Sequence, residues 1–420
     1  MAEWLEKTLG EVTAFIAKGI PPKYTEEENE NTIRVLNQKC NRNFEISYNE
    51  SRIHDCEKKK VPVDKMLRAG DVLINSTGTG TAGRVAQMVE VTVPTTIDGH
   101  MILIRPSEEL DPIYYGYAVK SFQSQIEGLA EGSTGQTEIN RRRLQDEVII
   151  RYPSDKLLQK NIGSFLANID EKIKTNKEIN NNLEQQAVLL FKKWFIEFDN
   201  SSKNMLETRF GLVPESFKLL KNRELPLVVT DYVANGSFAS LKANVTLYQE
   251  PNYAYFIRNT DLKSGKFEVF VDEHSYNFLS KSTLYGGEII ISNVGDVGSV
   301  FLCPKLDKPM TLGNNIIMLR PEQENLRYYL YIWFKWLYGQ SLIQGIKGGS
   351  AQPKFNKTDF KNLPIFLPPD DLLEQFHQIV KPMFELIDEN NMENQALTRT
   401  RDTILPRLMS GELDVSDIEI

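Results

Sequence analysis

The feature that most constrains this chain is a four-then-three spacing of residues that runs from Ile162 to Trp194. Eight of the ten positions are apolar, the residues between them are mostly polar, and no Pro interrupts the stretch. A period of 3.5 residues is typical of a coiled-coil seam. The helix would be roughly 57 Å long, and so narrow a stripe needs one facing helix to bury it. The predicted seam positions are Ile162, Leu166, Ile169, Ile173, Asn176, Asn180, Leu183, Ala187, Leu190 and Trp194.

A second stretch with the same spacing, Asp370 to Ser410, predicts the facing helix, so that the chain pairs with itself. Both seams are polar at their centres. Paired Asn side chains there would fix the register, and the alternative is that the helices splay and water covers these positions. Pro382 and Pro406 predict a kink or a local end. The predicted seam positions are Phe376, Ile379, Met383, Leu386, Asn390, Glu393, Leu397, Thr400, Ile404 and Arg407.

The rest of the chain repeats itself with a period of roughly 215 residues. Gly70–Ile74 (GDVLI) matches Gly287–Ile291 (GEIII), and Thr96–Pro106 (TIDGHMILIRP) matches Thr311–Pro321 (TLGNNIIMLRP) without a gap. Three further pairs match: Gly80–Val85 with Gly295–Val300, Gln136–Asn140 with Gln352–Asn356, and Ile149–Pro153 with Ile365–Pro369. Each half is therefore one mixed domain followed by one long helix.

Short Val- and Ile-rich runs bounded by Gly, Pro and Asn indicate strands, and two aromatic-rich stretches indicate helices that pack on the sheets. The predicted strands are Val72–Asn75, Val89–Val93, Met101–Ile104 and Val148–Ile150, and the predicted helices are Pro112–Leu129 and Asn325–Ile346. The expected fold class is α+β, with two pseudo-symmetric mixed α/β domains separated by two long antiparallel helices that form a coiled coil. The predicted segments are a first domain (1–153), a central helical region (154–202), a second domain (203–368), a C-terminal helical region (369–412) and a short acidic tail (413–420).

The net charge of −8 at first disfavours nucleic acid as a partner. However, residues 369–420 hold 12 Asp and Glu against 4 Lys and Arg, so the acidic excess lies mainly in the second helix and the tail. Charge therefore does not exclude a DNA-binding face on the two domains. The 3 Cys lack metal-ligand spacing, no apolar run is long enough to cross a membrane, and the acidic N-terminus lacks signal-peptide features. These observations predict a cytoplasmic protein with reduced thiols.

The stretch Gly78–Gly83 (GTGTAG) fits the G-x-G-x-x-G pattern of a dinucleotide site and follows a predicted strand. The next residues, Arg84–Val93, favour a strand where that site needs a helix, and the second copy at Asn293–Val300 lacks the first Gly. A tight connection between strands is the better interpretation. A nucleotide-dependent enzyme stays open as the competing hypothesis. No His, Cys or Ser motif predicts a metal site or a nucleophile.

Binding is the function class that remains. Lys and Arg near Gly-rich loops suit phosphate contact, and Gln suits base edges, whereas ordinary solvated charge is the alternative for each of them. Gln136 and Gln352 recur at equivalent places, which indicates either base reading or shared loop structure. The candidate DNA-binding residues are Lys58, Lys59, Lys60, Arg84, Gln136, Arg141, Arg142, Arg143, Lys242, Arg258, Lys263, Lys266, Lys347, Gln352 and Lys354.

Several segments, taken in their order, resemble the DNA-specificity subunits of Type I restriction-modification enzymes over essentially the whole chain. The carriers are GDVLINSTGTGTAGRV (70–85), GGEIIISNVGDVGSV (286–300), GGSAQPKFN (348–356), the long helix LLQKNIGSFLANIDEKIKTNKEINNNLEQQAVLLFKKWF (157–195) and the ending ILPRLMSGELD (404–414). The chain departs from the family mainly at Pro153-Ser154, where a Pro-Pro pair is expected, and at the two helical prolines.

The resemblance implies that the two domains are target-recognition domains, each reading one half of a split double-stranded DNA target. It implies that the helices pair, set the spacer and dock two methyltransferase subunits. It also implies no catalytic residue, metal or cofactor in this chain, because S-adenosylmethionine, ATP and magnesium would serve the methyltransferase and motor-nuclease subunits. A solitary scaffold without active partners is a third hypothesis. The expected helix-pairing residues are Ile162, Leu166, Ile169, Ile173, Leu183, Leu190, Phe376, Ile379, Met383, Leu386, Leu397 and Ile404.

Overall fold

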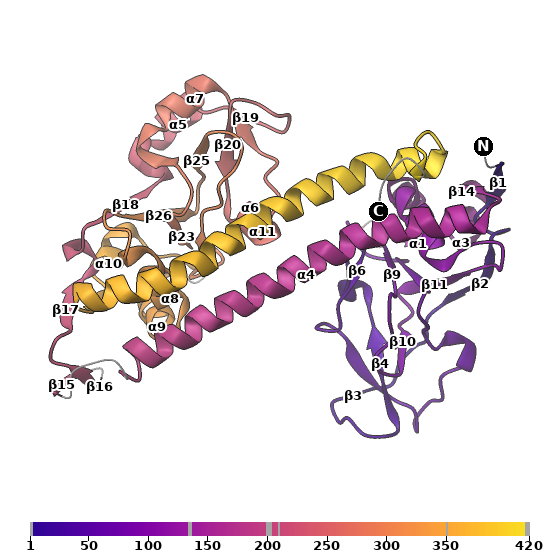
Figure 1. Cartoon of the computed structure of the whole chain (residues 1–420), viewed down its shortest axis with the longest axis horizontal. Coiled ribbons are helices and arrows are strands. Elements are labelled where there is room, and N and C mark those ends of the chain that lie inside the picture. The colour runs from indigo at the N-terminus through magenta and orange to yellow at the C-terminus, as the bar shows by residue number, and fades with distance from the viewer. Residues whose placement is uncertain (1–2, 133–136, 199–203, 209–210, 350–351, 416–420) are drawn as a thin grey trace. The chain divides into compact units, whose positions relative to one another are not determined.

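The computed structural model describes residues 3–132, 137–198, 204–208, 211–349 and 352–415 (Figure 1). The chain divides into two compact units: unit 1 is Met1–Thr175 with Glu393–Ile420, and unit 2 is Asn176–Met392. The division falls inside both long helices, α4 (Lys156–Phe195) and α11 (Asp370–Ser410). Each unit therefore packs its own half of each helix against its own sheet.

Unit 1 is built on an antiparallel four-stranded sheet of order β2-β11-β8-β9, with a second sheet of order β10-β4-β7-β3. The core strands are β2 (Thr13–Lys18), β8 (Val72–Asn75), β9 (Val85–Gln87) and β11 (Met101–Pro106). The second sheet contains β3 (Tyr24–Thr25), β4 (Thr32–Leu36), β7 (Arg52–Asp55) and β10 (Thr95–Ile97). The smaller pairs are β1 (Trp4–Thr8) with β14 (Ile149–Pro153), β5 (Asn41–Arg42) with β6 (Glu45–Ile46), and β12 (Ala130–Glu131) with β13 (Glu138–Ile139). The helices are α1 (Pro112–Ser121), α2 (Gln123–Gly128) and α3 (Arg141–Glu147).

Unit 2 repeats this plan with an antiparallel sheet of order β18-β26-β23-β24 and a second sheet of order β19-β21-β20-β25-β22. The core strands are β18 (Leu227–Asp231), β23 (Ile289–Ser292), β24 (Val300–Leu302) and β26 (Ile316–Pro321). The second sheet contains β19 (Leu247–Tyr248), β20 (Ala254–Ile257), β21 (Phe270–Val271), β22 (Thr283–Leu284) and β25 (Met310–Leu312). The pairs are β15 (Met205–Thr208) with β16 (Gly211–Pro214) and β17 (Lys218–Lys221) with β27 (Pro364–Leu367). The helices are α5 (Phe238–Asn244), α6 (Asn259–Ser264), α7 (Glu273–Phe278), α8 (Leu326–Lys335), α9 (Leu337–Gly345) and α10 (Lys357–Lys361).

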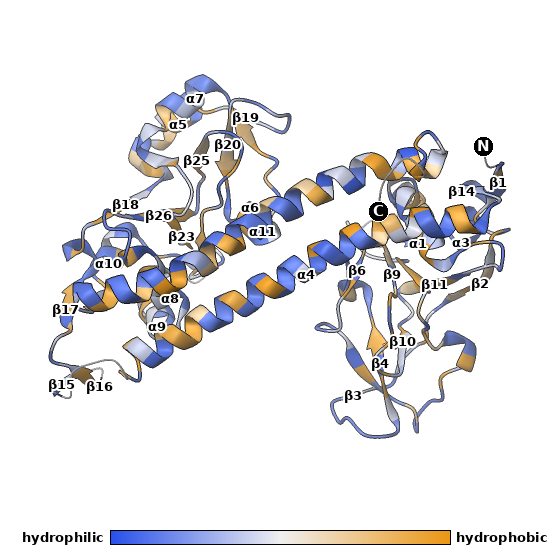
Figure 2. Ribbon diagram, viewed as in Figure 1, coloured by the Kyte–Doolittle hydropathy of each residue, from blue (hydrophilic) through white to orange (hydrophobic). Residues whose placement is uncertain are grey.

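Strand alternation gives each core sheet two apolar faces. In β8, Val72 and Ile74 pack with the helices of unit 1, while Leu73 packs toward the second sheet. In β23, Ile289 packs with the helices of unit 2, while Ile290 packs toward the second sheet. Each unit is thus three layers, helices, core sheet and second sheet, and hydrophobic residues gather on the core strands (Figure 2). This confirms the predicted α+β duplication.

The two scaffolds also share buried polar contacts. Asp71 pairs with the guanidinium of Arg105 at 2.7 Å in unit 1, and Glu288 pairs with Arg320 at 3.0 Å in unit 2. The units differ in the segment ahead of the second core strand. Unit 1 has the β5–β6 hairpin and β7 there, whereas unit 2 has α5, α6 and α7.

The predicted strand Val89–Val93 is wrong, because strand β9 lies earlier, at Val85–Gln87. The Gly-rich turn ends directly at this strand, and Val89 and Val93 are exposed beyond it. The other predicted elements correspond to β8, β11, β14 and the helix pairs α1–α2 and α8–α9.

Helix α4 presents its seam as the spacing indicates. Of the ten positions, Ile162, Leu166, Ile169, Ile173, Asn176, Ala187 and Trp194 are buried, and Asn180, Leu183 and Leu190 are half-buried. In unit 1, Ile162 and Leu166 share a core with Leu405 and Leu408 of α11. In unit 2, the ring of Phe376 lies 4.9 Å from that of Phe195. The helices are antiparallel within each unit.

Helix α11 departs from the predicted phase. Phe376 is buried and Met383, Leu397 and Ile404 are half-buried, but Ile379 and Leu386 are exposed by 42% and 40%. The residues that pack inward are their neighbours Val380 and Ile387. The reason is that this part of α11 packs on α8 as well as on α4: the Phe384 and Tyr328 rings stack at 4.5 Å.

The polar centre of the seam is a direct contact in unit 2. The Asn390 amide donates to Asn180 Oδ1 at 2.8 Å, and the Asn180 amide donates to Asn391 Oδ1 at 3.0 Å. Of the two interpretations, paired amides and splayed helices, the structure has paired amides at this point.

Neither proline ends the second helix. α11 runs without interruption through Pro382 and Pro406, and both side chains are exposed. Leu413 and Val415, at the start of the segment predicted as an acidic tail, pack on the core of unit 1.

Candidate nucleic-acid interface

Two loops meet at the same place in each unit. In unit 1 the β8–β9 connection is joined to the segment after the Gln136 loop by a bridge between Thr77 and Glu138. In unit 2 the β23–β24 connection is joined to the Gln352 loop by a bridge between Val294 and Lys354. The structure therefore brings together the two loop motifs that the sequence repeats.

The glycines of the first motif serve a strand connection. Gly83 has a φ of +87°, and a Cβ there would lie 2.6 Å from the backbone of α2. Gly298 has a φ of +99°, and its Cβ would lie 2.9 Å from Gln340 of α9. Only Gly fits such a conformation next to a packed helix. Because β9 follows directly and pairs antiparallel with β8, the Gly-rich turn leads into a strand and not into the helix that a dinucleotide site requires.

In unit 2 the joined loops carry three of the predicted residues, Lys347, Gln352 and Lys354, and all three side chains are exposed. Lys263 of α6 also reaches this surface, where its ammonium pairs with Asp296 of the β23–β24 connection at 2.5 Å. Hydrogen bonds from Lys263 and Ser299 hold the pKa of the Asp296 carboxyl below its ordinary value. Lys263 is therefore neutralised within the loop surface.

In unit 1 the same surface carries Arg84, whose guanidinium donates to the Gly80 carbonyl at 2.9 Å. Arg141 opens α3 next to it and is exposed. Arg142 pairs with Asp146 at 3.7 Å. Arg143 pairs with both Glu147 and Glu131. Gln136 lies outside the described residues.

The remaining candidates lie on other elements. Lys58, Lys59 and Lys60 follow β7 of the second sheet, where the Lys58 ammonium pairs with Asp55 at 3.0 Å and hydrogen bonding to it lowers the pKa of that carboxyl. Arg258 pairs with the buried Asp261 at 2.6 Å at the start of α6. Lys242 lies on α5, and Lys266 follows α6.

Ion pairing divides the candidate cations into two groups. Lys58, Arg142, Arg143, Arg258 and Lys263 each have a carboxylate partner. Across the described ranges, the other cations have none within 4 Å: Lys59, Lys60, Arg84, Arg141, Lys242, Lys266, Lys347 and Lys354. The second group can accept a phosphate without first breaking an ion pair with a carboxylate.

The roles of three residues near the candidate interface were not predicted from the sequence. Asn140 and Asn356 cap α3 and α10, each accepting from the backbone N–H groups of the first turn, so the repeat of the Gln loop partly reflects shared capping. The sequence could have indicated these caps, because each Asn directly precedes a short helix. His54 is fully buried and holds the Lys58–Lys60 loop, since its ring bonds Lys23 N at 2.8 Å and Lys59 O at 2.7 Å. No sequence pattern indicates that role.

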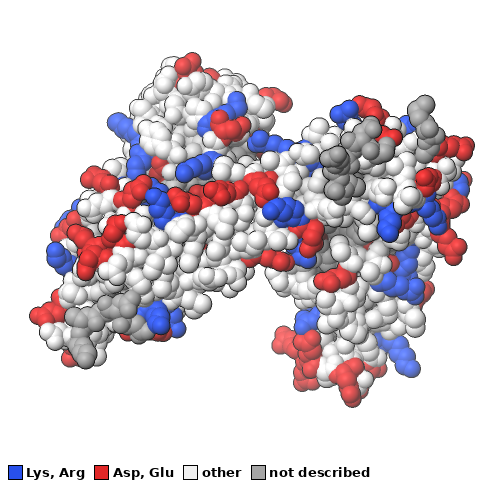
Figure 3. Space-filling view, viewed as in Figure 1, with Lys and Arg blue, Asp and Glu red and all other residues white. Residues whose placement is uncertain are grey.

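Acidic side chains gather in a row over the long helix α11 on the face of the molecule that Figure 3 shows. Glu374, Glu385 and Glu389 are exposed residues of this helix. Within the residues that the structure describes, no three His, Cys, Asp or Glu side chains form a group that could hold a metal ion. No helix in that part of the chain is both long and apolar enough to cross a membrane.

Two copies of one α/β scaffold, each packed on its own part of a helix pair, define a duplicated two-unit protein. The profile of the Type I restriction modification DNA specificity domain matches residues 1–185 and 233–399. The chain therefore belongs to the Type I restriction-modification DNA specificity family.

Curated relatives agree with this family. The chain is 27% identical over 310 residues to the Type I restriction enzyme MjaIX specificity subunit of Methanocaldococcus jannaschii, covering 73% of this chain and 69% of the relative. It is 24% identical over 314 residues to the HindI specificity subunit of Haemophilus influenzae, covering 62% and 68%. The crystal structure of the Type I restriction-modification S subunit from M. genitalium matches with a TM-score of 0.55 and 19% identity, over 97% of this chain and 96% of that one. That likeness shows the shared fold.

Proposed function

We propose that this chain is the non-catalytic DNA-specificity subunit of a Type I restriction-modification system and that each unit reads one half of a bipartite, asymmetric DNA target. One observation carries the proposal: the two units share a core scaffold but cover it with different elements, β3 and β7 in unit 1 and α5 to α7 in unit 2. Identical units would read a palindrome, whereas a diverged pair on one chain reads two different half-sites.

The unpaired cations support the phosphate-contact part of this proposal. Lys347 and Lys354 of unit 2, and Arg84 and Arg141 of unit 1, lie on or beside the joined loops of each unit. Gln352 lies on the same loop and offers both a donor and an acceptor to a base edge. Each mismatched base pair would cost about 1–3 kcal/mol.

The helices α4 and α11 would set the spacer between half-sites and dock two methyltransferase subunits, with motor-nuclease subunits completing the complex. S-adenosylmethionine, ATP and magnesium would bind those partners. We expect half-sites about one helical turn, ~10 bp, apart centre to centre, which leaves a non-specific gap of roughly five to eight base pairs.

The test is co-expression with the partner methyltransferase followed by genome-wide mapping of methylated adenine. We expect one split, asymmetric motif whose methylation disappears without this chain. Deleting seven residues from α4 and seven from the facing part of α11 should bring the half-sites closer by about 10 Å, or about three base pairs. Unchanged half-sites with a shorter gap support the spacer role. Altered bases within a half-site contradict it.

A further inference from the structure

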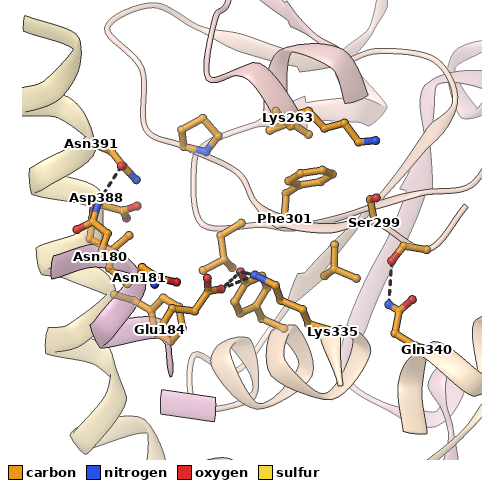
Figure 4. Close-up of a pocket in the computed structure, with 18 of the residues that line it drawn as sticks. Asn180, Asn181, Glu184, Lys263, Ser299, Phe301, Lys335, Gln340, Asp388 and Asn391 are labelled. Atoms are coloured by element: carbon orange, nitrogen blue, oxygen red, sulfur yellow. Dashed lines mark hydrogen bonds and ion pairs between the residues drawn. The ribbon is translucent and has the colours of Figure 1, made fainter. Parts of the chain in front are cut away.

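Unit 2 contains a cavity of about 810 Å³ between the edge strand β24 and the two long helices (Figure 4). Glu184 of α4 and Lys335 of α8 line one side of it. Figure 4 shows Phe301 of β24 across the cavity from Asp388 and Asn391 of α11. Apolar and polar side chains both contribute to the walls, so the cavity suits a mixed ligand such as a polypeptide side chain with its backbone.

The equivalent place in unit 1 is filled by the chain itself. Ala86 of the edge strand β9 corresponds to Phe301 in the repeat, and it bridges with Phe44 at the tip of the β5–β6 hairpin. The Phe44 ring lies 5.1 Å from the Tyr117 ring, centroid to centroid, and the Lys120 ammonium lies 4.1 Å from the Phe44 centroid. The hairpin thus covers both the strand edge and the ammonium.

The walls of the two sites share their chemistry. In unit 1 the Tyr117 hydroxyl donates to Asp170 of α4 at 2.6 Å, and the Lys120 ammonium lies 3.9 Å from the same carboxylate. In unit 2 the Tyr331 hydroxyl and the Lys335 ammonium both donate to Glu184 of α4 at 2.5 Å.

The difference between the sites is the aromatic cover. The Lys120 side chain is 12% exposed beneath Phe44, whereas the Lys335 side chain is 42% exposed. In the described part of unit 2, the space beyond β24 holds the cavity in place of a hairpin. An uncovered strand edge beside an uncovered cation offers backbone pairing and a cation–π contact to the same ligand.

Phe44 stands in the two-residue turn of the β5–β6 hairpin. Asn43 and Phe44 have φ of +54° and +64°, the left-handed pair that is typical of a type I′ hairpin turn. The Phe44 ring at this turn packs against Tyr117 and Lys120. A turn with an aromatic tip is therefore the form of cover that unit 1 supplies.

We propose that the cavity of unit 2 is a docking site for a polypeptide turn of a partner protein, which inserts an aromatic side chain between β24 and the long helices and covers Lys335. The proposal goes beyond DNA reading and rests only on the comparison of the two units. The partner would pair its backbone with the free edge of β24, as Phe44 does with β9.

The test uses the full-length chain and a hairpin peptide with the sequence of residues 40–47, in cyclised and linear forms. Phe44 of the peptide is replaced by photoreactive benzoylphenylalanine, and cross-links are mapped by mass spectrometry. We expect saturable cross-links to segments 297–302 and 331–335, competed by the Phe44 peptide and not by its Phe44→Ala form. Cross-links spread over other surfaces, or no saturable labelling with either form, overturn the proposal.

Two neighbouring substitutions on α4 give a matched control. Asn181 is exposed and lines the cavity, whereas Asn182 is exposed and does not. Asn181→Trp should lower labelling at least tenfold by filling the mouth, and Asn182→Trp should leave it within twofold. Equal labelling of the two variants overturns the proposal. Because no DNA or methyltransferase is present, this outcome is independent of the proposed function.

Discussion

Replacing the buried Lys120 by Met should stabilise unit 1, although Lys120 faces the carboxylate of Asp170. Burial lowers the pKa of Lys120 from its ordinary 10.5 to about 8, against the attraction of Asp170. Its ammonium makes no hydrogen bond to the described residues. Asp170 does not depend on it, because Arg401 and the Tyr117 hydroxyl both bind that carboxylate.

The size of the effect follows from the pKa difference. Holding the charged form of Lys120 in the folded state costs about 3 kcal/mol at neutral pH, since each pKa unit corresponds to 1.36 kcal/mol. Met keeps most of the apolar stem of Lys120 and carries no charge. We expect Lys120→Met to raise the stability of unit 1 by about 2–3 kcal/mol at pH 7.

The sign of the pH dependence is fixed by the direction of the pKa change. A base whose pKa is lower in the folded state is penalised at every pH below the folded value. The penalty fades as pH rises from about 8 toward 10.5, because folded Lys120 is then neutral and removing the proton that the unfolded chain still holds costs less at higher pH. The advantage of Lys120→Met should therefore be full below pH 8 and absent above about pH 10.5.

The assay is hydrogen exchange of the α1 amides under urea, which reports on unit 1 alone. Lys335→Met is the matched control at the equivalent position of unit 2. Lys335 is partly exposed and paired with Glu184, so its loss should cost about 0–1 kcal/mol. If Lys120→Met destabilises unit 1 at pH 7, the attraction to Asp170 outweighs burial and the reasoning fails.

Three further predictions concern the seam, the Gly-rich turn and the DNA surface. Asn180→Ala and Asn390→Ala should each cost about 1–2 kcal/mol, and the double variant less than their sum by about 1 kcal/mol, in urea unfolding; additive costs would contradict a direct amide pair. Gly83→Ala should cost more than 2 kcal/mol in thermal unfolding, and Gly80→Ala, where a Cβ meets open space, about 1 kcal/mol; equal costs would mean that contact with α2 is unimportant. Lys354→Ala should weaken DNA binding at all sequences and reduce the slope of log K against log salt by about 1, whereas an unchanged slope would remove this residue from the phosphate contacts.

The long helices could be predicted because the spacing of their apolar residues is visible in the sequence. The repeat could be predicted because the two halves of the chain can be compared directly. The seam of α4 follows from spacing except near its C-terminal end, where Phe191 and Phe195 are buried as well and Leu190 is only half-buried. The phase of α11 could not be predicted at Ile379 and Leu386. There α11 packs on the aromatic residues of α8 as well as on α4, so a wider side of the helix is buried. A spacing rule that assumes a single partner helix therefore places the buried positions one residue too early.

The candidate interface could be predicted only as a set of residue types. Lys and Arg are visible in a sequence, but their ion pairs are not. Arg143 stands in a run of three arginines and yet is bound by two carboxylates, one of them on β12. Lys347 and Lys354 look no more promising in the sequence, and both are exposed without a carboxylate partner among the described residues.

Because side-chain contacts are not visible in a sequence, the duplication of the two units is easier to recognise than the differences between their binding surfaces. Tyr117, Lys120 and Asp170 match Tyr331, Lys335 and Glu184 in chemistry, so each site has a hydroxyl, an ammonium and a carboxylate in its wall. One site is closed by Phe44 and the other is open, because the segment that supplies the cover belongs to the part of each unit that has diverged. The edges of β9 and β24 therefore differ through the diverged segment and not through the scaffold that the two units share.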